Sequence, residues 1–128
     1  MSKTRVLIVD DDVNLSRLSG MILENSGAYE VLTEKDSRRA LAVARQFQPE
    51  ILLLDVDMPH KTGGDLAREA QGDPLLREIP ILFLTGLVSK TEAGESEIES
   101  GGMSFLAKPV MPEVLLASVG KLVRNAGV

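Results

Sequence analysis

Two carboxylates follow the most apolar run of the chain. The segment "ILLLDVDMP" (51–59) places Asp55 directly after four aliphatic residues and Asp57 two positions later. A carboxylate at the end of a buried strand loses hydration, and this loss is costly unless a cation or hydrogen bonds compensate for it. The pattern therefore predicts that a positive partner reaches Asp55 in the folded chain.

Polar residues also end three other apolar runs. Asp10 and Asp11 follow "VLIV", Thr85 follows "ILFL", and Lys108 follows "FLA". If these runs are strands of one parallel sheet, their carboxyl ends lie along one edge, which is where such sheets bind ligands. We therefore expect these four residues and Asp55 to converge on one site.

The expected site has the composition of a phosphoryl-transfer centre. Three carboxylates within about 5 Å would repel by roughly 3 kcal/mol per pair at an effective dielectric constant near 20, so they need protonation, separation or a cation. Oxygen-only ligands with room for water suit Mg²⁺ better than Ca²⁺. Lys108 would add a second positive charge, and the Thr85 hydroxyl could donate to an oxyanion. Asp55 would then be a nucleophile that forms an aspartyl phosphate.

The elements that must position these residues alternate along the chain. Short, uniformly apolar runs separated by amphipathic segments predict a parallel sheet covered by helices on both faces. Asp12 or Asn14 is expected to cap the first helix. The expected strands span 4–9, 29–34, 50–55, 79–86 and 103–108. The expected helices span 13–27, 37–47, 64–72, 90–102 and 111–126. The helix 90–102 is expected to be weak, because it is acidic and contains Gly94.

Length, charge and composition narrow the function classes. With 128 residues, the chain is expected to form a single domain over 1–128. A net charge of −5 argues against a nucleic-acid backbone as a direct partner, because that affinity depends on Lys and Arg. The absence of cysteine excludes disulfides and thiolate metal sites and favours the cytoplasm, and no apolar run is long enough to span a membrane.

Four motifs together resemble the receiver domain of two-component response regulators. The motifs are "VLIVDDD", "ILLLDVDMPHKTGG", "ILFLTG" and "FLAKP", and the resemblance covers essentially the whole chain. It implies an α/β, flavodoxin-like (βα)5 doubly wound fold, with a five-stranded parallel sheet in the order 2-1-3-4-5. Where many receivers have Met-Asp-Gly after "MP" and one further residue, this chain has Lys61-Thr62-Gly63, which keeps the glycine and loses the acid.

The resemblance also assigns roles to the strand-end residues. It implies that Asp55 accepts a phosphoryl group from a histidine kinase or a histidine phosphotransfer protein. Asp10 and Asp11 would hold Mg²⁺ together with Asp55, and the backbone carbonyl of Asp57 would be a further ligand. His60, the single histidine, is expected to be a solvated loop residue.

The same resemblance implies a switch and a partner surface. Thr85 and Lys108 would contact the phosphoryl oxygens, and Thr85 and Phe105 would transmit the change. The partner surface would comprise the fourth helix (90–102), the fifth strand and the fifth helix, and a phosphorylation-dependent homodimer through it is a further hypothesis. An equally simple interpretation is that the apolar stripe of "EVLLASVGKLV" belongs to the core. A downstream protein, or an output domain that is not in this chain, would bind this surface and respond to phosphorylation.

Two other functions remain open from the sequence. "ILLLDVDMP" also resembles the nucleophile motif of haloacid-dehalogenase-type phosphatases, in which Asp57 would act as general acid and base. That family normally places the motif on its first strand and needs a longer chain. A receiver-like binding module that is no longer phosphorylated is the other alternative, although neither Asp55 nor Lys108 is missing.

Overall fold

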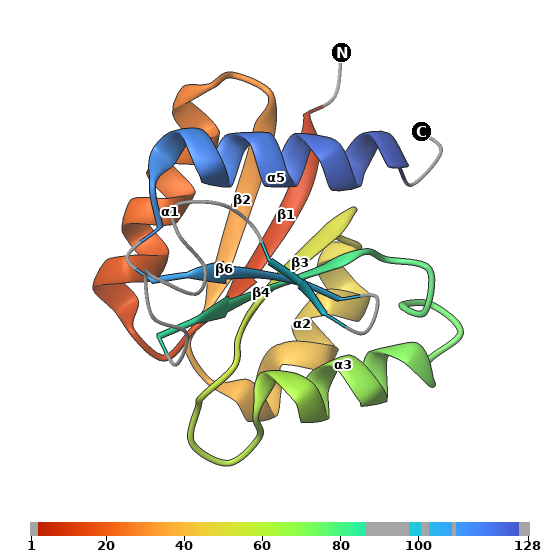
Figure 1. Ribbon diagram of the computed structural model, residues 1–128. Coiled ribbons are helices and arrows are strands. Elements are labelled where there is room, and N and C mark those ends of the chain that lie inside the picture. Colours follow the sequence, from red (N-terminus) through yellow and green to blue (C-terminus); the bar gives the residue numbers. More distant parts are fainter. Residues whose placement is uncertain (1–2, 87–97, 101–102, 109, 126–128) are drawn as a thin grey trace.

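The computed structural model describes residues 3–86, 98–100, 103–108 and 110–125 and has an α/β sandwich architecture (Figure 1). The strands are β1 (Thr4–Val9), β2 (Tyr29–Glu34), β3 (Ile51–Asp55), β4 (Ile81–Thr85), β5 (Ile98–Ser100) and β6 (Met103–Ala107). The helices are α1 (Val13–Asn25), the 3-10 turn η1 (Ser37–Arg39), α2 (Ala40–Phe47), α3 (Gly63–Gln71) and α5 (Pro112–Asn125).

The sheet confirms the predicted topology and adds one short strand. Its order is β2-β1-β3-β4-β6-β5, so the five parallel strands follow the order 2-1-3-4-5 when β6 is counted as the fifth. The additional strand β5 pairs with β6 in antiparallel orientation. The prediction of a helix over 90–102 is therefore wrong at Ile98–Ser100, which form a strand. These three residues pair with the edge of the sheet that β6 would otherwise leave open. The other residues of that segment lie outside the described part of the chain.

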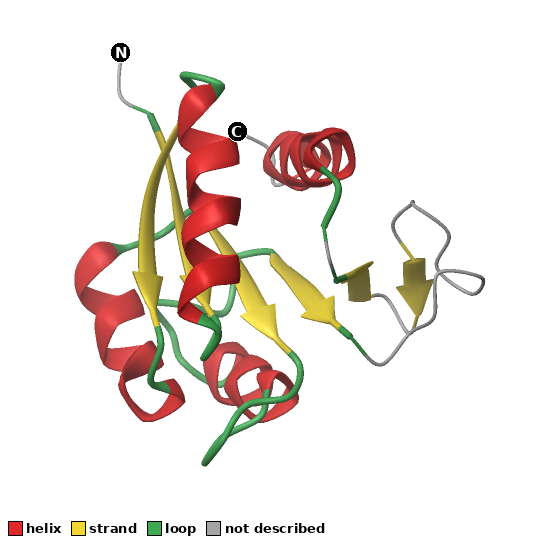
Figure 2. Cartoon of the chain, turned by 90° about the vertical axis from the view of Figure 1, so that its left-hand side faces the viewer, coloured by secondary structure: helices red, strands yellow, loops and turns green. Residues whose placement is uncertain are grey.

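The sheet separates two apolar cores. Because successive side chains of a strand point to opposite faces, each central strand contributes to both cores. Figures 1 and 2 show α1 and α5 on one side of the sheet and α2 and α3 on the other. The α1/α5 side is filled by Val6, Ile8, Leu23, Ile51, Leu53, Leu82, Leu84, Leu106, Leu115 and Val119, and the α2/α3 side by Leu7, Val9, Ala40, Ala44, Leu52, Leu54, Leu66, Ala67, Ala70 and Phe83.

The apolar stripe of α5 belongs to the core. Leu115 and Val119 are fully buried, and Val114, Leu116 and Leu122 pack against the core that contains them. This finding favours the second interpretation of the sequence, in which the stripe belongs to the core and holds α5 to the sheet. The predicted fourth helix lies outside the described residues except at 98–100, so dimerisation through the combined surface stays a prediction.

Local hydrogen bonds set the helix starts. Asp12 caps α1, as predicted, because its Oδ1 accepts a hydrogen bond from the Leu15 N–H at 3.1 Å. Thr62 and Asp65 form a reciprocal capping box at the start of α3. Pro112 is the first residue of α5, where its missing N–H has no intrahelical partner to lose.

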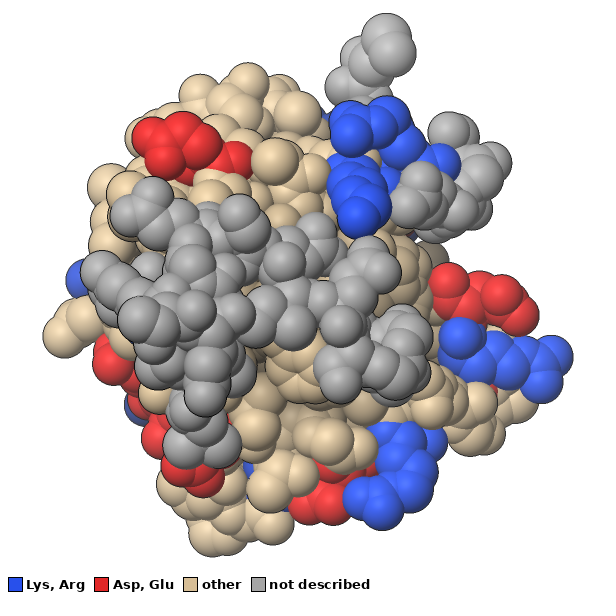
Figure 3. All heavy atoms as spheres, in the orientation of Figure 1, with Lys and Arg blue, Asp and Glu red and all other residues tan. Residues whose placement is uncertain are grey.

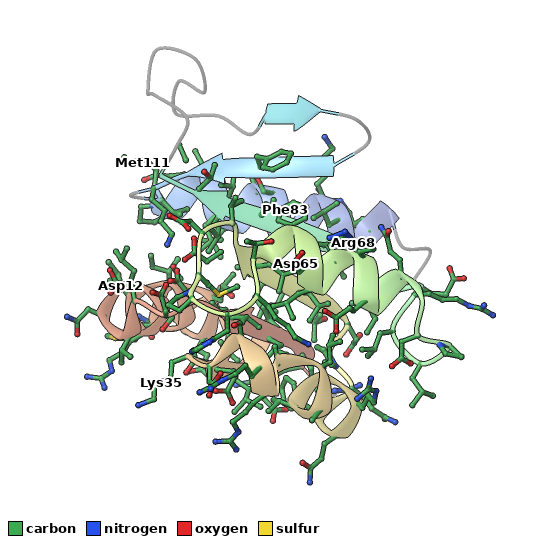
Figure 4. The ribbon with its side chains drawn as sticks, turned by 90° about the horizontal axis from the view of Figure 1, so that it is seen from below. Asp12, Lys35, Asp65, Arg68, Phe83 and Met111 are labelled. Atoms are coloured by element: carbon green, nitrogen blue, oxygen red, sulfur yellow. The ribbon has the colours of Figure 1, made fainter. Side chains whose placement is uncertain are left out.

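The connections that follow the strands gather at one end of the molecule. Figure 4 shows Asp12, Lys35 and Met111, which come from three different connections, on the same side of the structure. Parallel strands place all of their carboxyl ends together, so these connections border the predicted site. Away from it, acidic and basic side chains lie next to one another at the right and bottom of Figure 3, in keeping with exposed ion pairs such as Arg45–Asp73.

Candidate functional site

Three predicted acidic residues converge at the carboxyl edge of the sheet. Strands β1 and β3 pair directly, with Val9 opposite Leu54, so Asp10 and Asp55 follow them at the same level. Carboxylate oxygens of Asp10, Asp11 and Asp55 all lie within 4.8 Å of one another. Asp10 is 1% exposed and Asp55 is 5% exposed, whereas Asp11 faces solvent.

Lys108 neutralises part of this negative charge. Its Nζ lies 2.8 Å from Asp10 Oδ2 and 3.2 Å from Asp55 Oδ1. Its backbone N–H donates to the Thr85 carbonyl at 2.9 Å, which fixes the strand end that carries the side chain. Burial lowers the pKa of the ammonium, but the Asp10 carboxylate and then Asp55 outweigh this effect, so the pKa of Lys108 is raised overall. The lysine therefore stays charged between the two acids.

The pKa of the Asp55 carboxyl is raised by its surroundings. Burial, followed by the negative charge of Asp10, raises the pKa of Asp55 to about 6, although Lys108 acts in the opposite direction. One lysine thus does not compensate for the desolvation of Asp55 and the proximity of its acidic neighbours. A further positive charge would be favourable at this position.

The donor set fits a hard divalent cation. Oδ1 of Asp10 accepts a hydrogen bond from the Asp12 N–H at 2.9 Å. Oδ2 of Asp10 is buried and, among the described residues, has the Lys108 ion pair but no well-formed hydrogen bond. A buried carboxylate oxygen in this state is available to a metal ion. Because all the donors are oxygens, the cluster suits Mg²⁺.

Thr85 and Phe105 lie on the adjacent strands β4 and β6. Thr85 is 3% exposed at the last position of β4, opposite Ala107 of β6. Phe105 lies opposite Phe83, and their rings stack with centroids 5.0 Å apart and an interplanar angle of 21°. Alternation along β4 places Thr85 on the same face of the sheet as these two rings. The predicted switch residues therefore share one face of the sheet, and Phe105 stacks on Phe83, two positions before Thr85 on β4.

The loop between β3 and α3 (56–62) is fixed at both ends. At its start, the Val56 N–H donates to the Leu84 carbonyl at 2.9 Å, and at its end the Gly63 N–H donates to the Val56 carbonyl at 3.1 Å. A Cβ atom at Gly63 would lie 2.5 Å from the backbone oxygen of Asp55, so only glycine fits this approach. Asp57 lies in this loop with its side chain exposed.

A buried serine that the sequence did not single out contacts the middle of the same loop. Ser37 Oγ donates to the Pro59 carbonyl at 2.7 Å and accepts from the Lys61 N–H at 3.1 Å. Between these two residues, His60 is exposed, as predicted for a solvated loop residue, and has a φ of 72°. Ser37 stands at the start of a predicted helix, and no pattern in the sequence links it to residues 22 and 24 positions away.

Comparison with known proteins decides the family. Residues 6–120 match the family described as "Response regulator receiver domain". The chain belongs to this family. Receiver domains are components of two-component signalling, so the chain is a two-component receiver domain.

Among curated relatives, the response regulator PleD of Caulobacter vibrioides is 37% identical over 121 residues, covering 94% of this chain and 26% of the relative. The phosphate regulon transcriptional regulatory protein PhoB of Pseudomonas aeruginosa is 32% identical, covering 95% of this chain and 52% of the relative. The chain thus spans between about a quarter and a half of the curated relatives it matches.

Solved structures give the same fold. The chemotaxis protein CheY4 of Vibrio cholerae has a TM-score of 0.79 and 31% identity, covering 94% of this chain and 99% of that one. A CheY-like receiver domain protein of Methanospirillum hungatei has a TM-score of 0.80 and 26% identity, with 98% of each chain covered. None of the helices in the described part of the receiver has the length and apolarity to cross a lipid bilayer.

Proposed function

We propose that this receiver is a phosphorylation-dependent signalling switch in which Asp55 accepts a phosphoryl group from a histidine kinase or a histidine phosphotransfer protein. The observation that carries the proposal is the position of Asp55. Its carboxylate is buried at the end of β3, lies 3.2 Å from the Lys108 ammonium and shares its surroundings with Asp10 and Asp11. Such burial of like charges is typical of groups that act on a ligand.

In the proposed transfer, an Asp55 oxygen forms a bond to phosphorus while the bond between phosphorus and the donor's imidazole nitrogen breaks. The nitrogen leaves with the bonding electron pair. Asp10, Asp11, Asp55 and the backbone carbonyl of Asp57 would hold Mg²⁺, which supplies positive charge to the phosphoryl oxygens when bound. The chain's own contribution is to orient Asp55 and keep it buried.

Lys108 and Thr85 would bind the new phosphoryl group. Phosphorylation gives Lys108 a more highly charged partner than the Asp55 carboxylate, so its ammonium would turn toward the phosphoryl oxygens. The Thr85 hydroxyl would donate to another oxygen. Thr85 lies on the sheet face of the Phe83–Phe105 stack, so a shift of β4 would be transmitted to Phe105. Phosphorylation would in this way bias two arrangements of one surface.

We further propose that residues 1–128 act as one receiver unit in the cytoplasm that signals to a downstream protein or output domain. The partner surface would include β6 and α5. Because Leu115 and Val119 are core residues, the contacts would come from the exposed side of α5 rather than from its apolar stripe. A phosphorylation-dependent homodimer through this surface would form without exposing either residue.

The phosphatase alternative is less well supported. A phosphatase of that type would use Asp57 next to Asp55 as general acid and base. The Asp57 side chain is exposed, and the carboxylates that meet Asp55 within the described chain are those of Asp10 and Asp11. Membership of the receiver family points in the same direction.

The test is the mass of the intact protein after incubation with Mg²⁺ and acetyl phosphate or phosphoramidate. We expect a gain of one phosphoryl group that requires Mg²⁺ and is lost in Asp55→Asn. Asp73→Asn is the matched control, because it removes a carboxylate that pairs with Arg45 outside the site. An Asp55→Asn protein that gains the same mass as wild type would refute the proposal. No gain in the wild-type protein would leave a receiver that accepts phosphate only from its kinase, or a fold that has kept the site residues and lost their use.

A further inference from the structure

The centre of the β3–α3 loop contains a strained turn. The Lys61 N–H donates to the Pro59 carbonyl at 2.9 Å, and the residue between them, His60, has a φ of 72°. A hydrogen bond between residues two apart, with positive φ at the central residue, is the pattern of a classic γ-turn, which is rare and strained. A strained turn of this kind persists only where its surroundings hold it.

Ser37 provides that support from a different part of the chain. Its hydroxyl donates to the Pro59 carbonyl at 2.7 Å and accepts from the Lys61 N–H at 3.1 Å, so it binds both ends of the turn. Ser37 is only 3% exposed, and water therefore has little access to replace it. Asp36 holds the serine in place, because its Oδ1 accepts from the Arg38 N–H at 2.9 Å and caps η1.

The loop is thereby fixed at three points. Val56 is bound to Leu84 at the start, Gly63 closes on Val56 at the end, and Ser37 holds the middle. Asp57 lies between the first and the middle of these points. Its backbone carbonyl is the ligand proposed above, and this ligand can be placed only by fixing the main chain around it.

We propose that Ser37 is a positioning residue for the cation site. It holds residues 57–61 in a single conformation and so fixes the backbone carbonyl of Asp57 beside Asp55. The inference rests on the proposed function, because it assigns Asp57 the role of a metal ligand. Residues that orient metal ligands through hydrogen bonds commonly change metal affinity by about 10–100-fold when they are removed.

Ser26 offers a matched control. Its hydroxyl also donates to a carbonyl, that of Leu23 at 2.6 Å, and accepts from an N–H, that of Ala28 at 3.3 Å. It caps the end of α1, just before β2 begins, and is therefore remote from the carboxyl edge of the sheet. Ser26→Ala and Ser37→Ala remove the same two types of hydrogen bond, but only Ser37→Ala is expected to release the loop.

The experiment measures Mg²⁺ binding by titration calorimetry and amide hydrogen exchange of the metal-free protein. We expect Ser37→Ala to weaken Mg²⁺ binding by about tenfold and to accelerate exchange of the Lys61 amide. Ser26→Ala should keep the wild-type Mg²⁺ affinity and Lys61 exchange rate. Wild-type Mg²⁺ affinity in Ser37→Ala, or an equal loss in both variants, would overturn the inference and leave the proposed function intact. A wild-type protein that binds no Mg²⁺ would overturn both.

Discussion

Asp10 and Asp55 share one counter-ion, the ammonium of Lys108, at 2.8 and 3.2 Å. Asp11 brings a third carboxylate within 4.8 Å of the other two acids. Within the described part of the chain, three carboxylates thus lie close to one ammonium, and two of the three, Asp10 and Asp55, are buried. Without a bound cation, this imbalance acts against the folded state, because unfolding returns the buried Asp55 carboxylate to water.

Replacing Asp55 by Asn should therefore stabilise the metal-free protein, and the gain should depend on pH. The pKa of Asp55 is about 6 in the folded protein, and its usual value is 3.8. Between these two pH values the folded state keeps a proton that the unfolded state releases. Wild-type stability should fall relative to Asp55→Asn as pH rises from 4 to 6. Above pH 7 the variant should be more stable by about 1–3 kcal/mol, while at pH 3.5 the two should be equal. Urea unfolding with chelator at each pH measures this difference.

Asp73 provides a control, because its pKa is shifted in the opposite direction to that of Asp55. The hydrogen bond from the Arg45 side chain, then that from the Leu75 N–H, lowers the pKa of the Asp73 carboxyl. This interaction stabilises the folded protein above the usual pKa of an aspartate and is lost as pH falls below it. Asp73→Asn should thus be less stable than wild type at pH 7. An Asp55→Asn variant that also loses stability at pH 7 would contradict the charge imbalance proposed for the site.

The sequence predicted the site residues that stand at the ends of apolar runs. It did not predict residues whose hydrogen-bond partners are distant in sequence. Asp10, Asp55 and Lys108 end apolar runs, and the parallel arrangement brings such ends together. Ser37 carries no comparable signal, because its partners become neighbours only when the β3–α3 loop folds over η1. The positive φ of His60 was equally hidden, since histidine does not require that conformation.

At the scale of elements, the β3–α3 loop turns the chain back against the strand it has just left. The turn is tight, because the Gly63 N–H bonds to the Val56 carbonyl and no side chain separates α3 from the Asp55 backbone. The start of α3 therefore controls the backbone of the proposed phosphoryl acceptor. The Thr62–Asp65 capping box holds the helix start in this position.

Gly63→Ala should destabilise the protein by about 1–3 kcal/mol, the usual cost of forcing extra atoms into a packed site. The added Cβ would lie 2.5 Å from the Asp55 carbonyl oxygen, so the strand end or the helix must move. Gly64→Ala is the control, because a Cβ at Gly64 would have its nearest neighbour at 3.7 Å. Thermal unfolding and the rate of phosphorylation by acetyl phosphate test both variants. Equal stabilities and rates for the two would show that the close approach has no consequence.

Element boundaries followed from the sequence where a residue type dictates them. The apolar runs gave all five parallel strands, with β4 starting at Ile81 rather than Ile79, in line with the exclusion of Pro80 from a strand interior. Strand β5 was not predictable in the same way. Its three residues, Ile98–Ser100, are too few to show an alternation of apolar and polar side chains. They form a strand because they pair with β6.

At the scale of the whole molecule, the site joins parts of the fold that are distant in sequence. Asp10 follows β1, Asp55 ends β3 and Lys108 follows β6, so a ligand of these residues spans the centre of the sheet. The fold class was predictable because alternating strands and helices permit few arrangements. The effect of the site on the free energy of unfolding was not predictable, because it depends on how deeply each charge is buried.

Mg²⁺ should therefore stabilise the whole domain and not only the loops around it. A ligand that binds only the folded state adds RT ln(1 + [L]/Kd), or about 2.7 kcal/mol at one hundred times Kd. Urea unfolding at increasing MgCl₂, with NaCl adjusted to constant ionic strength, should show this gain in wild type. Asp10→Asn should lose most of it, because Asp10 Oδ2 is buried and has no hydrogen bond from the described residues. Equal stabilisation of wild type and variant would mean that the cation acts through general charge screening, and the assignment of Asp10 as a metal ligand would be wrong.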